Sequence, residues 1–136
     1  MPVKNHTILC IDDDPDDLEL LIEACHKIDP SHKIEVATNG YKGLDKLQEM
    51  KKNDDLPCLI VLDINMPGLN GKETLTEIKK DSDLSKVHIV IFSTSNSSVD
   101  KLFFQSKGVE YMTKPLDYAS LVQVASKLLS YCQSRK

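Results

Sequence analysis

Short runs of apolar residues recur along the chain and alternate with stretches of helical periodicity. The runs are Thr7–Ile11, Ile34–Ala37, Leu59–Leu62, Ile89–Phe92 and the short Glu110–Met112. The segments ILCI, LIVL and IVIF within them are apolar throughout. Continuous apolar character is typical of strands buried on both faces of a parallel sheet. The pattern therefore predicts five parallel strands.

After each run, apolar residues recur every three or four positions, which is the spacing of one face of an amphipathic helix. The residues expected to face inward, helix by helix, are Leu18, Leu21, Ile22 and Cys25; Leu44, Leu47 and Met50; Leu75 and Ile78; Val99, Leu102, Phe103 and Ser106; and Leu121, Val124, Ala125, Leu128 and Cys132. Five β–α repeats with right-handed crossovers predict a doubly wound α/β sandwich, with residues 1–136 forming a single domain.

Bulk composition fits this interpretation. The chain has 136 residues, of which 40% are hydrophobic and 28% charged, as in an ordinary soluble domain. The net charge of -4 argues against a nucleic-acid surface. No stretch approaches membrane-spanning length, and the N-terminus lacks the apolar core of a signal peptide. We expect a cytoplasmic protein whose partners are neither nucleic acid nor membrane.

The four cysteines, Cys10, Cys25, Cys58 and Cys132, are scattered without paired spacing. A metal site or a disulfide framework would show regular spacing, so the sequence supports neither. Cys10 and Cys58 lie in apolar surroundings, and we expect both to be small buried side chains.

Polar residues directly follow four of the five predicted strands. Asp12 and Asp13 follow the first, Asp63 the third, Ser93 the fourth and Lys114 the fifth. In open α/β sheets, ligands bind beyond the carboxyl ends of the strands, where strand order reverses. The sequence therefore predicts a site at this edge.

The adjacent acids Asp12 and Asp13 end a buried strand, where two like charges repel each other. A divalent cation would relieve that repulsion, whereas the acids that follow are explained as helix-capping and first-turn residues. An EF-hand calcium loop would need glycine at its sixth position, which is Asp17 here, and a helix before it. We therefore expect Mg²⁺ at Asp12 and Asp13.

Asp63 would share this edge with two further carboxylates and with Lys114. A carboxylate can attack phosphorus and form an aspartyl phosphate. Phosphoryl transfer needs positioning and charge neutralisation, which a magnesium ion and a lysine ammonium supply. This combination predicts that Asp63 is a nucleophile in phosphoryl transfer.

Four segments, ILCIDDDPDD, LIVLDINMPGLNG, IVIFSTS and YMTKPLD, occur in this order and together resemble the CheY-like receiver domain of two-component response regulators. Asp13 and Asp63 are 50 residues apart, Asp63 and Ser93 30, and Ser93 and Lys114 21. The resemblance extends from about Thr7 to Tyr131. It implies a flavodoxin-like (βα)5 fold with strand order 2-1-3-4-5.

The resemblance implies a role for each matching residue. Asp63 is the phospho-acceptor, Asp13 a direct magnesium ligand, and Asp12 a weaker or water-mediated one. Asn65 gives its backbone carbonyl to the metal. Lys114 pairs with acid before transfer and with phosphate afterwards. The resemblance also implies a cis peptide bond between Lys114 and Pro115.

Ser93 matches the switch hydroxyl, which turns inward to bond a phosphoryl oxygen, and Tyr111 matches its aromatic partner. Many members of the family have threonine at this position; serine keeps the hydroxyl but lacks the methyl group that restricts χ1. Thr94 and Ser95 either set how easily water reaches the phosphoryl group or act as helix caps.

The function implied is that of a stand-alone response regulator, phosphorylated on Asp63 by a sensor histidine kinase and switching partner binding through Ser93 and Tyr111. Apart from its own magnesium-dependent phosphorylation and dephosphorylation, it would not be an enzyme. The chain ends with the last helix, so it either acts through a partner or belongs to a longer protein. The motifs are also similar to those of regulators that serve phytochrome-type and other sensor kinases.

Two other functions are compatible with an α/β core of this kind. A magnesium-dependent hydrolase with an aspartyl nucleophile would carry that nucleophile in a D-x-D motif at the first strand and would have an inserted cap region. Here the first strand ends in the adjacent pair Asp12 and Asp13, the expected nucleophile follows the third strand, and no cap region is inserted. A flavin-binding protein would need a phosphate-binding loop rich in serine, threonine and glycine, where this chain is acidic. A phosphatase assay and an absorbance spectrum would test these alternatives.

Phe104 lies one position beyond the face predicted to pack on the sheet, so we expect it to be exposed. Exposed aromatic residues often anchor interfaces. Phe104 is therefore predicted to belong to a surface of the fourth helix, fifth strand and fifth helix that binds a kinase, an effector protein or a second copy of the chain.

Overall fold

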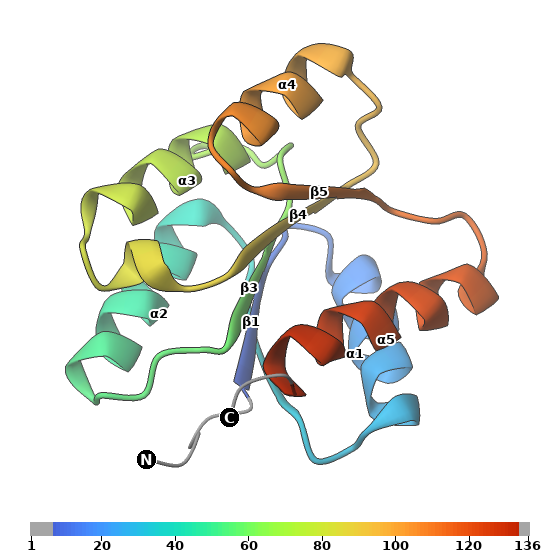
Figure 1. The fold of residues 1–136 in the computed structure, drawn as a ribbon. Helices are drawn as coiled ribbons and strands as arrows, with labels where there is room; N and C mark the ends of the chain where they lie inside the picture. Colours follow the sequence, from blue (N-terminus) through green and yellow to red (C-terminus); the bar gives the residue numbers. More distant parts are fainter. Residues whose placement is uncertain (1–6, 134–136) are drawn as a thin grey trace.

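Five parallel strands form the centre of the molecule in a computed structural model that describes residues 7–133 (Figure 1). They are β1 (Thr7–Ile11), β2 (Lys33–Ala37), β3 (Leu59–Leu62), β4 (Ile89–Ser93) and β5 (Glu110–Thr113). Their order is β2-β1-β3-β4-β5. Every predicted strand is present, with bounds that differ from the prediction by at most one residue. The strand order that the resemblance implied is confirmed.

Helices cover both faces of the sheet, with α1 and α5 on one side and α2, α3 and α4 on the other (Figure 1). Their bounds are α1 (Pro15–Ile28), α2 (Gly40–Lys52), α3 (Gly71–Lys80), α4 (Ser98–Ser106) and α5 (Tyr118–Gln133), with a short 3₁₀ helix, η1 (Leu84–Lys86), before β4. Within residues 7–133, no helix combines the length and the apolar character that crossing a bilayer requires.

The sheet separates two hydrophobic cores, and its strands contribute to both. Successive side chains of a strand point to opposite faces. In β1, Ile8 and Cys10 therefore pack with α1 and α5, while Leu9 and Ile11 pack with α2 and α3. All four are at most 2% exposed. This burial on both sides explains why the first run is apolar throughout.

The orientation of α4 differs from the prediction. Val99 and Leu102, expected to face inward, are 68% and 65% exposed, whereas Phe104 is fully buried. Asp100 lies one turn before Phe104 on the same helix face, and its carboxylate pairs with the ammonium of Lys72 of α3 at 2.7 Å. That ion pair and the burial of the larger ring turn the Phe104 face inward. The prediction of Phe104 as an exposed partner anchor is therefore wrong.

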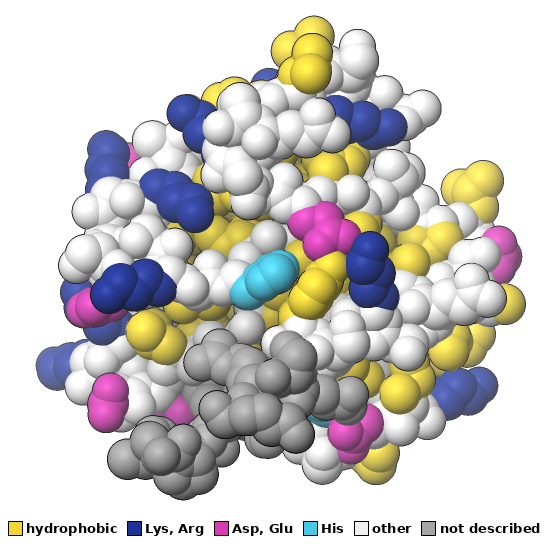
Figure 2. All heavy atoms as spheres, viewed as in Figure 1, with side chains coloured by type: hydrophobic (Ala, Val, Ile, Leu, Met, Phe, Trp, Pro, Cys, Tyr) yellow, Lys and Arg dark blue, Asp and Glu magenta, His cyan; other side chains and the backbone are white. Residues whose placement is uncertain are grey.

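Figure 2 shows the solvent-exposed side of α4. Apolar side chains protrude over α4 at the top of this face, with basic side chains beside them. Val99 and Leu102, which the sequence had assigned to the inner face of α4, are among the exposed apolar residues of the molecule.

The cysteines also differ in part from the prediction. Cys10 and Cys58 are buried, as expected. However, Cys58 forms a disulfide with Cys132, which lies 74 residues further along the chain. Spacing in the sequence cannot show this pairing, because the fold alone brings the start of β3 beside the end of α5. Cys10 and Cys25 are free thiols.

Candidate functional site

Four side chains gather where the central strands end. Asp12 follows β1, Asp63 follows β3, Ser93 ends β4 and Lys114 follows β5. The backbone fixes the two acids, because the amide of Asp12 donates to Ala37 at 3.0 Å and that of Asp63 to Ile11 at 2.9 Å. Asp12 and Asp63 are each 7% exposed and Ser93 is fully buried. The predicted convergence of strand-end residues is therefore present.

The turn that follows Asp63 is held in place by a close contact with the backbone at the start of α3. The amide of Gly71, the first residue of α3, donates to the carbonyl of Ile64 at 2.8 Å. A Cβ at Gly71 would lie 2.4 Å from the carbonyl oxygen of Asp63 and 2.6 Å from the Cα of Ile64. Only glycine allows α3 to begin directly against the acid-bearing turn.

Lys114 lies nearest to the acids of β1 and α1. Its Nζ is 2.6 Å from an oxygen of Asp12, 2.8 Å from Asp17 and 3.9 Å from Asp63. Burial alone would lower the pKa of Lys114, but the hydrogen bonds to Asp12 and Asp17 outweigh it and raise that pKa. The ammonium is therefore held charged between the two elements. An acid in the first turn of a helix needs no further explanation, so the contact between Asp17 and Lys114 could not be predicted from the sequence.

The acids form a compact group. Asp12, Asp13 and Asp63 each offer an oxygen, and these atoms lie within 4.8 Å of one another. Burial raises the pKa of Asp63 to about 6; the charge of Asp12 adds to this, and Lys114 and Ser93 oppose it. Hard divalent cations such as Mg²⁺ prefer carboxylate oxygens. The three carboxylates therefore fit such an ion, and binding it would reduce the repulsion among them.

The start of α1 borders this group. Asp14 is the N-cap, and its carboxylate accepts from the amides of Asp16 and Asp17. The amide of Asp14 in turn donates to Asp12 at 3.0 Å. Asp14 thus has the capping role that the sequence indicated, and Asp12 is oriented by the turn that leads into the helix.

Ser93 and Tyr111 are linked through the backbone of Ser95. The Ser95 amide donates to the Ser93 hydroxyl at 3.2 Å. The Tyr111 hydroxyl donates to the Ser95 carbonyl at 2.7 Å. The Ser95 hydroxyl donates to Asp100 at 2.9 Å, and Ser97 is the N-cap of α4. The loop after β4 is thus tied to the strand-end site, to β5 and to α4.

The resemblance also implied a role for Asn65 and a cis bond before Pro115. Asn65 lies in the turn after Asp63 with its side chain exposed, and its role toward a metal stays a prediction. The Lys114–Pro115 bond is not cis, since residues 7–133 contain no cis peptide bond. That prediction is wrong; trans is the favoured isomer before proline, by about 0.5–1 kcal/mol.

A family model described as the response regulator receiver domain matches residues 8–126. The chain belongs to this family. Receiver domains of response regulators function in two-component signalling.

Two relatives match the receiver chain over nearly its whole length. PilH of Pseudomonas aeruginosa is 30% identical over 124 residues, which cover 90% of this chain and 97% of PilH. Rcp1 of Synechocystis is 28% identical over 127 residues, which cover 91% of this chain and 86% of Rcp1. Rcp1 is a response regulator by name.

Solved structures agree with the receiver fold. The phosphorylated cyanobacterial phytochrome response regulator RcpA is 28% identical, with a TM-score of 0.86 and 96% of each chain covered. The Mn²⁺-bound form of Rcp1 is 27% identical, with a TM-score of 0.83 and the same coverage. A response regulator of Legionella pneumophila is 36% identical, with a TM-score of 0.79, covering 97% of this chain and all of that one.

Proposed function

We propose that this receiver acts as a stand-alone phosphorylation switch with Asp63 as its acceptor and residues 1–136 as one domain. The observation that carries the proposal is the buried Asp63 carboxylate beside Lys114 and two further acids, at the edge where four parallel strands end. Three carboxylates with oxygens within 4.8 Å of one another repel each other, and a bound cation would offset this cost.

The proposed step is a phosphoryl transfer. An oxygen of Asp63 attacks phosphorus, the new bond between that oxygen and phosphorus forms, and the bond to the donor breaks. The donor keeps the electron pair of that bond. For a sensor histidine kinase, the bond that breaks joins phosphorus to an imidazole nitrogen. The ammonium of Lys114 balances negative charge on the transferred group.

Asp12, Asp13 and Asp63, with the backbone carbonyl of Asn65, would hold a Mg²⁺ ion. When bound, such an ion neutralises charge on the phosphoryl oxygens. The carboxylate donor set and the Mn²⁺-bound form of the relative Rcp1 support a divalent cation here.

Phosphorylation would be transmitted through Ser93 and Tyr111. A phosphoryl oxygen on Asp63 is a strong acceptor for the Ser93 hydroxyl. Turning that hydroxyl toward it disturbs the link from Ser93 to Ser95 and from Ser95 to Tyr111. The loop before α4 would then shift, and binding of a downstream effector protein or of a second copy would change with it. We place this switch in the cytoplasm, downstream of a sensor histidine kinase.

The acceptor is tested with acetyl phosphate, a small phosphodonor, in the presence of Mg²⁺. Intact-mass spectrometry should show one added phosphoryl group on the wild type and none on Asp63→Ala. Asp45→Ala, which removes an exposed acid of α2, is the control and should be phosphorylated normally. Circular dichroism checks that each variant is folded. Normal phosphorylation of a folded Asp63→Ala protein would disprove the assignment.

The same sample tests the hydrolase alternative. A receiver phosphorylates only itself, so p-nitrophenyl phosphate should show no rapid sustained turnover. Rapid multiple turnover that depends on Asp63 would favour a hydrolase instead.

A further inference from the structure

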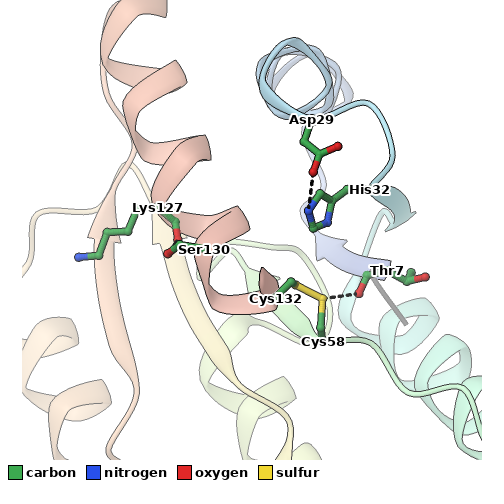
Figure 3. Close-up of a disulfide and its surroundings, with 7 residues drawn as sticks. All are labelled: Thr7, Asp29, His32, Cys58, Lys127, Ser130 and Cys132. Carbon is green, nitrogen blue, oxygen red and sulfur yellow. Dashed lines mark hydrogen bonds and ion pairs between the residues drawn. A yellow bond between two sulfur atoms is a disulfide. The ribbon is translucent and has the colours of Figure 1, made fainter. Parts of the chain in front are cut away.

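The disulfide between Cys58 and Cys132 joins two elements of the fold (Figure 3). It lies at the opposite end of β3 from Asp63, because Cys58 precedes this strand and Asp63 follows it. Cys58 directly precedes β3, and Cys132 lies in the last turn of α5. Their Cα atoms are 5.3 Å apart, within the roughly 4.4–6.8 Å that disulfides require. The backbone therefore holds the two residues at bonding distance through the packing of α5 on the sheet.

The same place also suits the reduced state. Cys58 Sγ lies 3.3 Å from the carbonyl oxygen of Thr7, as the dashed line in Figure 3 shows. A thiol at Cys58 can donate a hydrogen bond to that oxygen, whereas a disulfide sulfur has no hydrogen to give. Cys58 and Cys132 are 3% and 0% exposed, respectively, and belong to the same apolar cluster. Neither redox state leaves a charged group in the core.

Two further thiols act as an internal comparison. Cys10 and Cys25 are buried in the same apolar cluster but form no bond with each other. Burial raises the pKa of the Cys25 thiol to about 11 and that of Cys10 further. Cys58 and Cys132 are equally buried, so burial does not distinguish the two pairs of cysteines. The distinction lies in the geometry, because only Cys58 and Cys132 are bonded to each other. The geometry directs oxidation to one pair out of the four cysteines.

The covalent ring that this disulfide closes contains most of the strand-end site. β3 leads from Cys58 to Asp63, and α5 begins at Tyr118, shortly after Lys114. Ser93 lies between them in the sequence. Closing the ring therefore fixes the far end of α5 without contacting Asp63 or Lys114.

We propose that Cys58 and Cys132 form a reversible redox site, whose oxidation clamps the last turn of α5 to the start of β3. The oxidant is a low-molecular-weight disulfide such as oxidised glutathione. Both cysteines are buried, so the reaction takes place when the last turn of α5 opens. One cysteine, as the thiolate, then attacks the oxidant, forming a mixed disulfide and releasing one thiol. The second cysteine then displaces the other thiol. The protein loses two electrons and two protons, and the oxidant becomes two thiols. The inference does not rest on phosphorylation.

Oxidation should slow the opening of the last turns of α5 and raise the melting temperature. A link between residues 74 positions apart restricts the unfolded chain strongly. For a domain of this size, the expected rise is on the order of 10 °C.

The experiment compares the full chain after treatment with dithiothreitol and after oxidised glutathione. Free-thiol titration should give four thiols in the reduced form and two in the oxidised form, and peptide mapping should identify the linked pair. Hydrogen exchange should be slower in the oxidised form at Leu128–Cys132. Dithiothreitol added to the folded, oxidised protein should restore all four thiols.

Cys132→Ala should show neither the thiol loss nor the rise in melting temperature on oxidation, whereas Cys25→Ala should show both. Wild-type mapping needs no variant, so it decides the case even if Cys132→Ala does not fold. Failure to form the 58–132 link, or a link that uses Cys10 or Cys25, would overturn the proposal. A link that dithiothreitol cannot reduce without unfolding the protein would also overturn it, because the clamp would then be permanent.

Discussion

Lys114 has two carboxylate partners that are closer than Asp63. Its Nζ is within 3 Å of Asp12 and Asp17 but 3.9 Å from Asp63. The proposed chemistry needs the same ammonium near the phosphoryl group on Asp63. Asp17, on the first turn of α1, therefore competes with the acceptor for Lys114, although it belongs to neither the metal set nor the switch.

Replacing Asp17 with asparagine should speed phosphorylation by acetyl phosphate, by up to about fivefold. The partly exposed ion pair between Lys114 and Asp17 contributes about 0.2–1 kcal/mol, and this pair must break before the ammonium can move toward Asp63. Without Asp17 the activation free energy is lower by that amount. The rate is measured by intact mass over time at saturating Mg²⁺.

Asp16→Asn is the matched control, because Asp16 is an exposed acid in the same first turn and its removal changes net charge equally. Equal rates for Asp17→Asn and wild type would contradict the competition. An equal gain in Asp16→Asn would point to the general charge of the helix start instead.

Much of the site could be predicted residue by residue. Asp12, Asp63, Ser93 and Lys114 each follow or end an apolar run, and parallel strands bring such positions to one edge. The role of Asp17 could not be predicted, because an acid in the first helical turn is sufficiently explained by the helix dipole. Its contact with Lys114 depends on how α1 leans on the sheet.

Among the elements, α4 is too short for its apolar periodicity to show which face is buried. Its nine residues include Val99, Leu102, Phe103 and Phe104, which together surround much of the helix. More than one face therefore looks apolar, and the sequence pattern cannot choose between them. The choice is made by tertiary contacts, in which the Phe104 ring lies 5.0 Å from Phe103 and 6.1 Å from Tyr111 between centroids. Strands with continuous apolar runs carry no such ambiguity, which is why they were predicted correctly.

Phe104→Ala should lower the free energy of unfolding by about 3–5 kcal/mol, because it removes a fully buried ring and leaves a cavity. Leu102→Ala, on the exposed side of the same helix, should change it by no more than about 0.5 kcal/mol. Urea unfolding followed by circular dichroism measures both. Similar losses of unfolding free energy for the two variants would mean that the Phe104 face of α4 does not pack against the sheet.

At the scale of the whole molecule, the acidic group joins parts of the sheet that are distant in sequence. Asp12 and Asp13 come from the end of β1, and Asp63 from the end of β3. The repulsion among them opposes folding, and a cation bound to them stabilises the entire fold by linkage. The melting temperature therefore reports on the site.

Asp13→Asn should melt at a higher temperature than wild type in the presence of a chelator, because one repelling charge is gone. Mg²⁺ at about a hundred times its dissociation constant should raise the melting temperature of the wild type by roughly 5–10 °C and that of Asp13→Asn far less. Differential scanning calorimetry with and without Mg²⁺ measures both effects. The same Mg²⁺-induced shift in the two proteins would show that Asp13 is not a ligand.

The global architecture was accessible from the sequence, while its covalent link was not. Five apolar runs and the helices between them define the layers of the sandwich, because each element must bury one face. The approach of Cys58 to Cys132 instead depends on the exact length and tilt of α5. No local pattern carries that information.

The position of β1 between β2 and β3 has a consequence for how the chain folds during synthesis. β1 can pair with β2 as soon as the first β–α–β unit has emerged from the ribosome, but its other edge stays unpaired until Leu59–Leu62 follow. Asp12 and Asp13 are made early, yet they meet Asp63 only when this second edge closes. A nascent chain that ends before β3 therefore has no three-carboxylate site. Such a chain can bind a cation at this site only after β3 has paired with β1.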